Sequence, residues 1–200
     1  CGYKEDTFYN GIDRIDSDIS YTLDNIVSCC HLCNMTKGVS DIGSFLQKVR
    51  QIAIYNCKDS DLIEYNFHSK ELFKTNCVSY NTYKSRGNKK FNSFELSEED
   101  YSCLTTSPCY LCWALDGTNG IDRINNSFGY FLDNVAPCCS FCNIMKRGID
   151  LDIFLSSIDS ITLHSISDRH MNLAKNSSFR KFYSAKNKED VCDSFEDLTL

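Results

Sequence analysis

The sequence predicts an α+β protein built from small repeated modules, each held together by a bound metal ion. Three observations lead to this prediction: an internal repeat, 13 cysteines in 200 residues, and several of those cysteines in C-x-x-C spacing. The odd number of cysteines excludes complete internal disulfide pairing. Because no secretion signal opens the chain, the spacing indicates metal binding in the cytosol or nucleus.

The composition excludes several other classes of protein. A hydrophobic fraction of 42% permits a buried core, while 2 Pro and 9 Gly argue against collagen-like and linker-dominated chains. No apolar run approaches the ~18 residues of a membrane span, so no membrane partner is expected. The net charge of −6 argues against coating nucleic acid by bulk positive charge, although local basic patches are compatible with it.

Two copies of one sequence unit occupy residues 10–49 and 119–158. They align without gaps at an offset of 109 residues, with 18 identities in 40 positions. A fainter similarity between residues 82–95 and 182–196 predicts the start of a third unit or is coincidental. The missing initial Met suggests a piece of a longer protein. We expect a truncated first module at 1–50, a connecting segment at 51–101, a complete second module at 102–160 and another connecting segment at 161–200.

Each module is expected to contain a hairpin followed by a helical turn. In the second module, residues 120–124 alternate apolar and charged side chains as a short strand does, and residues 125–129 have turn chemistry. Residues 130–136 can return as the partner strand, which Pro137 would end. A helical turn is expected over 143–146.

Longer helices are expected after each module and before the second one. Asp150 is a candidate N-cap, and Ser40 is the corresponding candidate in the first module. The expected buried stripes are Ile153, Phe154, Ser157 and Ile158, and Ile42, Phe45, Leu46 and Val49. Ser97 followed by three acids predicts a further short helix.

Two C-x-x-C knuckles in the second module offer four thiolates to one metal ion. Tetrahedral coordination by four soft ligands, with sulfur about 2.3 Å from the ion, favours zinc in a structural role. The expected ligands are Cys109, Cys112, Cys139 and Cys142. Cys138 is an alternative to Cys139, with less favourable spacing.

The first module contains three of the four expected ligands. These are Cys1, Cys30 and Cys33, and the fourth would lie three residues before Cys1. This zinc site is therefore expected to be incomplete, with His31 as a less well-spaced substitute ligand. For the four cysteines of the second module, the alternative is a group of reduced core cysteines. The cysteines that fit no motif are expected to be free thiols: Cys57, Cys77, Cys103 and Cys192.

The combined pattern resembles the zinc-containing HNH endonucleases, which have the ββα-metal or His-Me finger fold. The resemblance rests on C-x-x-C, then G-I-D-R-I, then G-Y-x-x-D-N-V-x-P-C-C-x-x-C-N-x-x-K, with Y-K-S-R in the lead-in. It covers about 10–38 and 80–146. It implies tandem modules in which a hairpin and a helix hold a divalent cation, usually Mg²⁺, beside a phosphodiester.

The family's functional positions carry over to both modules. The resemblance implies Asp122 and Asn143 as cation ligands, with Asp13 and Asn34 in the first module. It also implies that Asn134, and Asn25 in the first module, orient the catalytic group. A simpler alternative is that these are ordinary hairpin and cap residues.

The position of the family's catalytic histidine holds arginine in both modules, as Arg123 and Arg14. Arginine stays protonated, so it is no general base near neutral pH, but it can hold a phosphate. Asp16 could activate water in the first module, whereas its counterpart Asn125 could not. One interpretation is a metal-dependent endonuclease with an altered base. The other is an inactive, zinc-stapled module that binds nucleic acid or another partner.

Basic residues cluster at two places beside the expected hairpin. The lead-in carries Lys84, Arg86, Lys89 and Lys90, and Lys146 and Arg147 follow the second knuckle. Interleaved with aromatic residues, such clusters can contact phosphates and bases, although a solvated face is the simpler alternative. We expect DNA rather than RNA as the partner. Repeated modules of this kind would suit a mobile element or a large virus.

Overall fold

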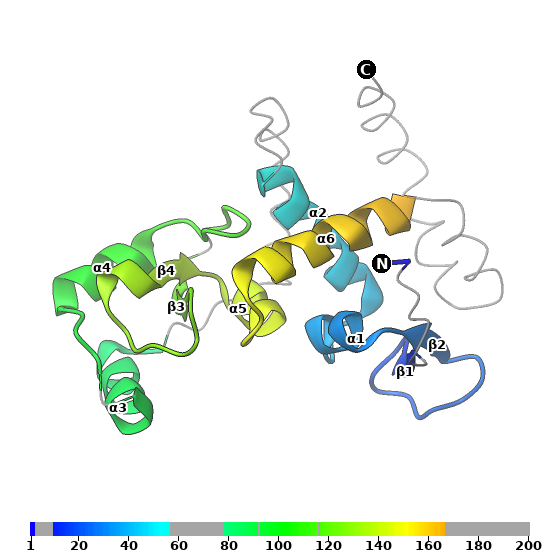
Figure 1. Ribbon diagram of the computed structural model, residues 1–200, viewed down its shortest axis with the longest axis horizontal. Coiled ribbons are helices and arrows are strands. Elements are labelled where there is room, and N and C mark those ends of the chain that lie inside the picture. The colour runs from blue at the N-terminus through cyan, green and yellow to red at the C-terminus, as the bar shows by residue number, and fades with distance from the viewer. Residues whose placement is uncertain (3–9, 57–77, 92, 116, 167–200) are drawn as a thin grey trace, which may run out of the picture. The chain divides into compact units, whose positions relative to one another are not determined.

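The computed structural model describes residues 1–2, 10–56, 78–91, 93–115 and 117–166. It confirms a mixed α+β fold with two β-hairpins. The chain divides into two compact units, Cys1–Gln47 with Ser160–Leu200, and Lys48–Asp159. Each unit contains one hairpin and the short helix that follows it (Figure 1).

The hairpin of the second unit pairs β3 (Gly120–Arg123) with β4 (Val135–Cys138) in antiparallel register. The return strand starts later than predicted, because a 3₁₀ turn over Leu132–Asn134 precedes it. Pro137 lies within β4 instead of ending it. A two-stranded ribbon has free edges, and proline is tolerated there because its missing N–H need not serve a partner strand.

The second knuckle is also the start of a helix. Helix α5 (Ser140–Lys146) begins one turn earlier than predicted, with Cys139 as its N-cap. The Cys139 sulfur accepts a hydrogen bond from the backbone N–H of Cys142 at 3.5 Å. This bond satisfies one of the orphan N–H groups of the first turn, so the C-x-x-C spacing shapes the helix end as well as the thiol pair.

The first unit has the same order of elements. Strand β1 (Gly11–Arg14) pairs antiparallel with β2 (Ile26–Cys29), and α1 (His31–Lys37) follows. Cys30 caps α1 as Cys139 caps α5, accepting from the N–H of Cys33 at 3.4 Å. The repeat in sequence is therefore a repeat in structure.

Helix α2 (Ile42–Asn56) follows the first module, but Ser40 does not cap it. The cap is Asp41, whose carboxylate accepts from the N–H of Ser44 at 2.8 Å. Phe45, Leu46 and Val49 are buried as predicted, whereas Ile42 is only half-buried. The predicted cap lies one residue too early because serine and aspartate are both good caps and stand side by side.

Helix α6 (Leu151–Ile166) follows the second module, with Asp150 at its start as predicted. Most of the predicted stripe is buried: Phe154, Ser157 and Ile158. Ile153 is wrongly assigned to it, since 56% of its surface is exposed.

Helices α3 (Tyr80–Phe91) and α4 (Glu98–Thr106) precede the second hairpin. The predicted cap of α4 is confirmed as a capping box between Ser97 and Asp100. Helix α3 was not predicted. A small aromatic core joins these helices to the hairpin: Leu96, Ile121 and Val135, with Tyr83, Phe94, Tyr101, Leu104 and Tyr130 packed around them. This core positions α3 beside β3.

Candidate functional site

The four predicted ligands of the second module meet in one buried cluster. The sulfurs of Cys109, Cys112, Cys139 and Cys142 all lie within 4.8 Å of one another. Four sulfurs about 2.3 Å from a tetrahedral zinc ion stand roughly 3.8 Å apart. The Cys112 and Cys139 sulfurs are 3.8 Å apart. The donor set and its spacing therefore fit a structural zinc ion, which these four side chains would hold.

Backbone hydrogen bonds shape the first knuckle around this cluster. The N–H of Cys109 donates to the carbonyl of Ala114 at 2.9 Å, and the N–H of Trp113 donates to the carbonyl of Cys109 at 2.8 Å. Trp113 adopts a left-handed φ of 59° to close this turn. The tight turn brings both sulfurs of the knuckle to the same side.

A buried lysine lies against the thiol cluster. The Lys48 ammonium is 3.3 Å from the sulfur of Cys112 and 2.8 Å from the side-chain oxygen of Gln51, and Lys48 has no exposed surface. Burial lowers the pKa of Lys48, but the nearby cysteine sulfurs outweigh burial and raise it above its usual range. Four thiolates around Zn²⁺ carry excess negative charge, which this ammonium offsets.

The thiols of the cluster differ in acidity. Hydrogen bonding among them lowers the pKa of Cys112 and raises the pKa values of Cys109 and Cys139, whereas burial raises that of Cys142. Without an ion, one thiolate is therefore favoured over four. Zinc binding has to release the remaining protons, which makes loading pH-dependent.

The first module brings three thiols together, as predicted. The sulfurs of Cys1, Cys30 and Cys33 lie within 4.8 Å of one another, and the Cys1 and Cys30 sulfurs are 3.6 Å apart. Neither Cys138 nor His31 belongs to a cluster among the described residues. Cys103 is an exposed free thiol. Cys57, Cys77 and Cys192 lie outside the described residues.

The two predicted asparagines on the return side fasten the hairpin loops. In the second module, the Asn134 side chain accepts from the Asn125 N–H at 2.9 Å and donates to the carbonyls of Asn125 and Gly129 at 3.0 and 2.9 Å. Asn25 makes the corresponding bonds, accepting from and donating to the backbone of Asp16. The hairpin-residue alternative accounts fully for these contacts.

The arginines at the histidine position also contact their own hairpin loops. Arg123 donates to the carbonyls of Asn126 and Phe128 at 3.0 and 2.9 Å, and its guanidinium lies 5.2 Å from the centre of the Tyr130 ring. Arg14 repeats this arrangement, donating to a loop carbonyl at 3.2 Å and lying over Tyr21. Both arginines are thus held in fixed positions at the hairpin.

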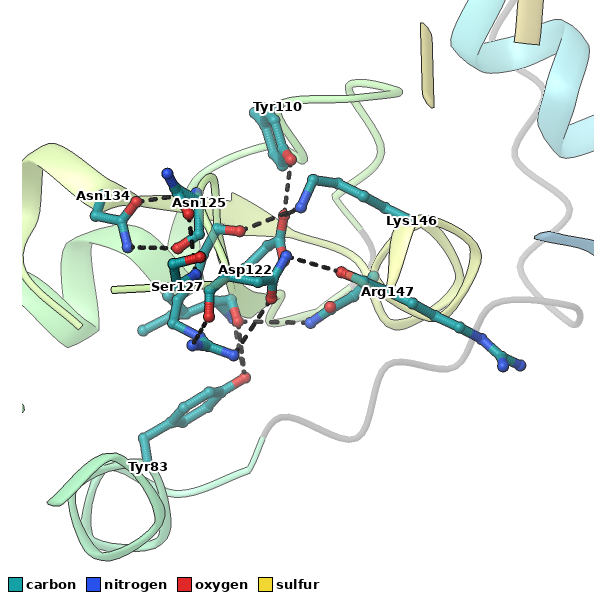
Figure 2. Close-up of polar contacts among 12 residues, drawn as sticks. Tyr83, Tyr110, Asp122, Asn125, Ser127, Asn134, Lys146 and Arg147 are labelled. Atoms are coloured by element: carbon teal, nitrogen blue, oxygen red, sulfur yellow. Dashed lines mark hydrogen bonds and ion pairs between the residues drawn. The ribbon is translucent and has the colours of Figure 1, made fainter. Parts of the chain in front are cut away.

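The predicted cation ligand Asp122 is buried against a lysine. Its carboxylate lies 2.9 Å from the Lys146 ammonium and accepts from the Tyr110 hydroxyl at 2.7 Å (Figure 2). Burial, and then the Asp122 charge, raise the pKa of Tyr110 well above its usual range, so it remains a donor. In the first module, Asp13 and Lys37 form the same pair at 3.2 Å. An ammonium already stands where a divalent cation would bind, so the residues as arranged do not fit Mg²⁺.

The second predicted cation ligands are the asparagines after the last knuckle cysteine. The side-chain amide of Asn143 reaches the carbonyl of Ile121 at 3.5 Å, and that of Asn34 reaches the carbonyl of Ile12 at 3.4 Å. Asp122 and Asn143 line the same cavity of about 560 Å³. The structure therefore brings these two side chains to one cleft, from β3 and α5.

The basic cleft, as we call it, consists of this cavity and a second one of about 530 Å³. Both cavities are lined by Arg86, Arg123 and Tyr130, so they adjoin. The basic residues that line the cleft are Arg86, Lys89, Lys90, Arg123 and Arg147. Asp122 is the one carboxylate among its described lining residues, and Lys146 offsets its charge.

Two of the predicted nucleic-acid contacts lie elsewhere. Lys84 is exposed on α3 but lines neither cavity, and its ammonium lies 5.5 Å from the centre of the Tyr80 ring. Lys146 is fully buried, so it offers no surface to a phosphate. Lys146 was predicted as a phosphate contact because it stands next to Arg147 in the sequence, but only Arg147 is exposed.

Arg147 occupies an unfavourable backbone conformation at the end of α5. Its φ is 48° and its ψ −123°, while the corresponding Gly38 in the first module has φ 57° and ψ −129°. In both, the N–H bonds to the carbonyl four residues earlier at 2.9 Å. Glycine adopts such a conformation freely, whereas a side chain is strained there. The second module therefore places a basic side chain at the cleft despite a conformational cost.

Comparison with known proteins finds similarity to a viral chain. The chain is 36% identical over 156 residues to a protein of Acanthamoeba polyphaga mimivirus described as "Uncharacterized protein R423". The match covers 76% of this chain but only 28% of that protein, so the chain spans little more than a quarter of its relative's length. No protein-family model matches, and no solved structure matches.

The relative comes from a giant virus, one of the two sources that the repeated modules predicted. Among the described helices, none combines the length and apolarity needed to cross a bilayer.

Proposed function

We propose that this chain is a zinc-stapled nucleic-acid-binding module derived from the HNH scaffold, binding phosphates in the basic cleft. The observation that carries the proposal is the charge of the cleft: five basic side chains line it, against one carboxylate whose charge Lys146 offsets. This local excess stands in a chain of net charge −6. Concentrated positive charge of this kind is what recognition of a polyanionic backbone requires.

The strained Arg147 supports a binding role for the cleft. Strain of this kind persists where the residue serves a purpose that glycine would not, and Gly38 shows that glycine suits the position. The three basic side chains of α3 that line the cleft are all exposed and lie within one turn of one another: Arg86, Lys89 and Lys90. They can follow a phosphate backbone along the helix face.

The zinc ions would serve as staples in this proposal. A module this small has little core of its own, and the four sulfurs join the knuckle before β3 to the helix after β4. The sulfur cluster thereby fixes α5, which carries Asn143, and the C-cap residue Arg147 against β3. The proposed partner of this module is DNA inside the host cell, as suits a relative of a viral protein.

The proposal is tested by fluorescence anisotropy with labelled duplex DNA, single-stranded DNA and RNA over a range of salt concentrations. Arg86→Gln should weaken binding and lower the salt dependence by about one phosphate contact. Lys84→Gln is the matched control: it removes the same charge from the same exposed helix but lines neither cavity. Equal effects of the two variants, or no salt-sensitive binding, would contradict the proposal.

A nuclease is the second candidate, favoured by the common cleft of Asp122, Arg123 and Asn143, and it requires a divalent cation to displace the Lys146 ammonium from Asp122. A plasmid nicking assay with Mg²⁺ or Mn²⁺ distinguishes it. Cleavage by the parent chain that Asp122→Ala abolishes, with unchanged zinc content, would establish the nuclease and displace the binding-only reading. Cleavage gained only by Arg123→His would identify a silenced nuclease.

A further inference from the structure

We infer that Lys146 and Lys37 are resident cations, each filling a divalent-cation site that becomes available when the ammonium is removed. The inference concerns the carboxylate–lysine pairs themselves and holds whether or not the cleft binds nucleic acid. It assigns to each lysine a role that the resemblance does not supply. The ligand class of the uncovered site is a hard divalent cation.

The atoms around the two ammonium groups are the ligands that such cations prefer. The Lys146 Nζ lies 2.9 Å from a carboxylate oxygen of Asp122 and 3.1 Å from the carbonyl oxygen of Arg123. The Lys37 Nζ lies 3.2 Å from a carboxylate oxygen of Asp13 and 2.9 Å from the carbonyl oxygen of Arg14. Carboxylate and carbonyl oxygens are typical ligands of Ca²⁺, Mg²⁺ and Mn²⁺.

The same geometry occurs twice in modules that differ at more than half of their aligned positions. In both, the lysine is the last residue of the helix after the hairpin, and the acid is the third residue of the first strand. Both lysines are almost completely buried. Because the pair forms in both copies of the repeat, a chance contact of one flexible side chain is an insufficient explanation.

A bound ammonium excludes a divalent cation from the same oxygens. It donates to the carboxylate that the ion would need, and it repels any further positive charge a few ångströms away. Removing the ammonium by Lys146→Ala should leave a cavity lined by these oxygens, with room for water molecules to complete the coordination of a cation. Lys146→Met removes the charge but fills most of the space.

The test is Mn²⁺ binding to the zinc-loaded full chain, measured through the electron paramagnetic resonance signal of the free ion. We expect Lys146→Ala to bind Mn²⁺ at least tenfold more tightly than the parent chain, and Lys146→Met to gain much less. Lys146→Ala combined with Asp122→Asn should lose the gain, which assigns the bound ion to this carboxylate. Zinc content and circular dichroism check that each variant is folded.

Lys37→Ala repeats the test in the first module. Its control is the double variant Lys37→Ala with Asp13→Asn. This second pair keeps the test decisive if Lys146→Ala does not fold. The inference is overturned if the parent chain already binds Mn²⁺ through Asp122 or Asp13 as tightly as the alanine variants. It is equally overturned if folded alanine variants gain no Mn²⁺ affinity. Nucleic-acid binding enters neither measurement, so the proposed function stands or falls separately.

Discussion

Replacing Arg147 by glycine should stabilise the protein and weaken its binding to nucleic acid at the same time. Arg147 has a φ of 48° at the end of α5, where Gly38 stands in the first module with nearly the same backbone angles. Its side chain is exposed and lines the basic cleft. The substitution therefore removes strain and a candidate phosphate contact in a single step.

The expected size of each effect follows from the structure. Relief of a strained non-glycine conformation gains about 1–3 kcal/mol, and glycine returns about 0.5–1 kcal/mol through greater freedom in the unfolded chain. The net free energy of unfolding should rise by about 0.5–2 kcal/mol, which raises Tm by a few degrees. Loss of one charge-assisted phosphate contact, about 1.5 kcal/mol, should weaken nucleic-acid binding roughly tenfold.

Thermal unfolding of the zinc-loaded chain measures the first effect, and anisotropy at fixed salt measures the second. Gly38→Arg in the first module is the reciprocal variant and should lower Tm, because it introduces the strain that Arg147→Gly removes. A lower Tm for Arg147→Gly would refute the assignment of strain. Unchanged binding would refute a phosphate contact by Arg147, whatever happens to stability.

Three further predictions concern the scaffold. Lys48→Met, made in a background lacking the first cysteine cluster, removes the ammonium beside the thiols, so the thiol pKa values should rise and half-loading with zinc should move to higher pH. Zinc affinity, measured by chelator competition, should fall roughly 10- to 100-fold. An unchanged pH midpoint of zinc loading would contradict this. Asn134→Ala breaks three hydrogen bonds of a buried amide and should lower the free energy of unfolding by about 3 kcal/mol in denaturant titrations; a loss below a third of that would show that water replaces the amide. Gly129→Ala places a Cβ against the Ser93 carbonyl oxygen, closer than real Cβ atoms approach, and should cost about 1–3 kcal/mol of unfolding free energy. Gly148→Ala meets no atom within 4 Å and serves as the matched control.

The thiol clusters could be predicted from sequence because ligand spacing in a knuckle is a local property. Two cysteines three residues apart need only a tight turn to face one ion, and both predicted clusters assemble in the structure. The hairpin strands were also predictable from alternation and turn residues. Their boundaries were not, because the 3₁₀ turn before β4 depends on how Asn134 ties the loop together.

The ion pairs and α3 depend on tertiary contacts that the local pattern does not encode. Lys37 meets Asp13 across 24 residues, although the identity of both positions in the two copies was visible in the repeat. Helix α3 is polar and has no clear apolar stripe of its own. Its two tyrosines, Tyr80 and Tyr83, pack against aromatic rings from α4 and the hairpin region, and this packing holds the helix in place.

The differences between the two modules predict which of them binds phosphates more strongly. Both share the asparagine that ties the loop, the arginine over the tyrosine and the buried acid–lysine pair. A buried ion pair adds little stability over apolar packing, so the acid–lysine pair acts mainly by fixing the angle between hairpin and helix. The position after the shared lysine differs, with Arg147 in one module and Gly38 in the other. The second module has an arginine with a strained backbone where the first has an unstrained glycine. Phosphate binding should therefore be stronger in the second module than in the first.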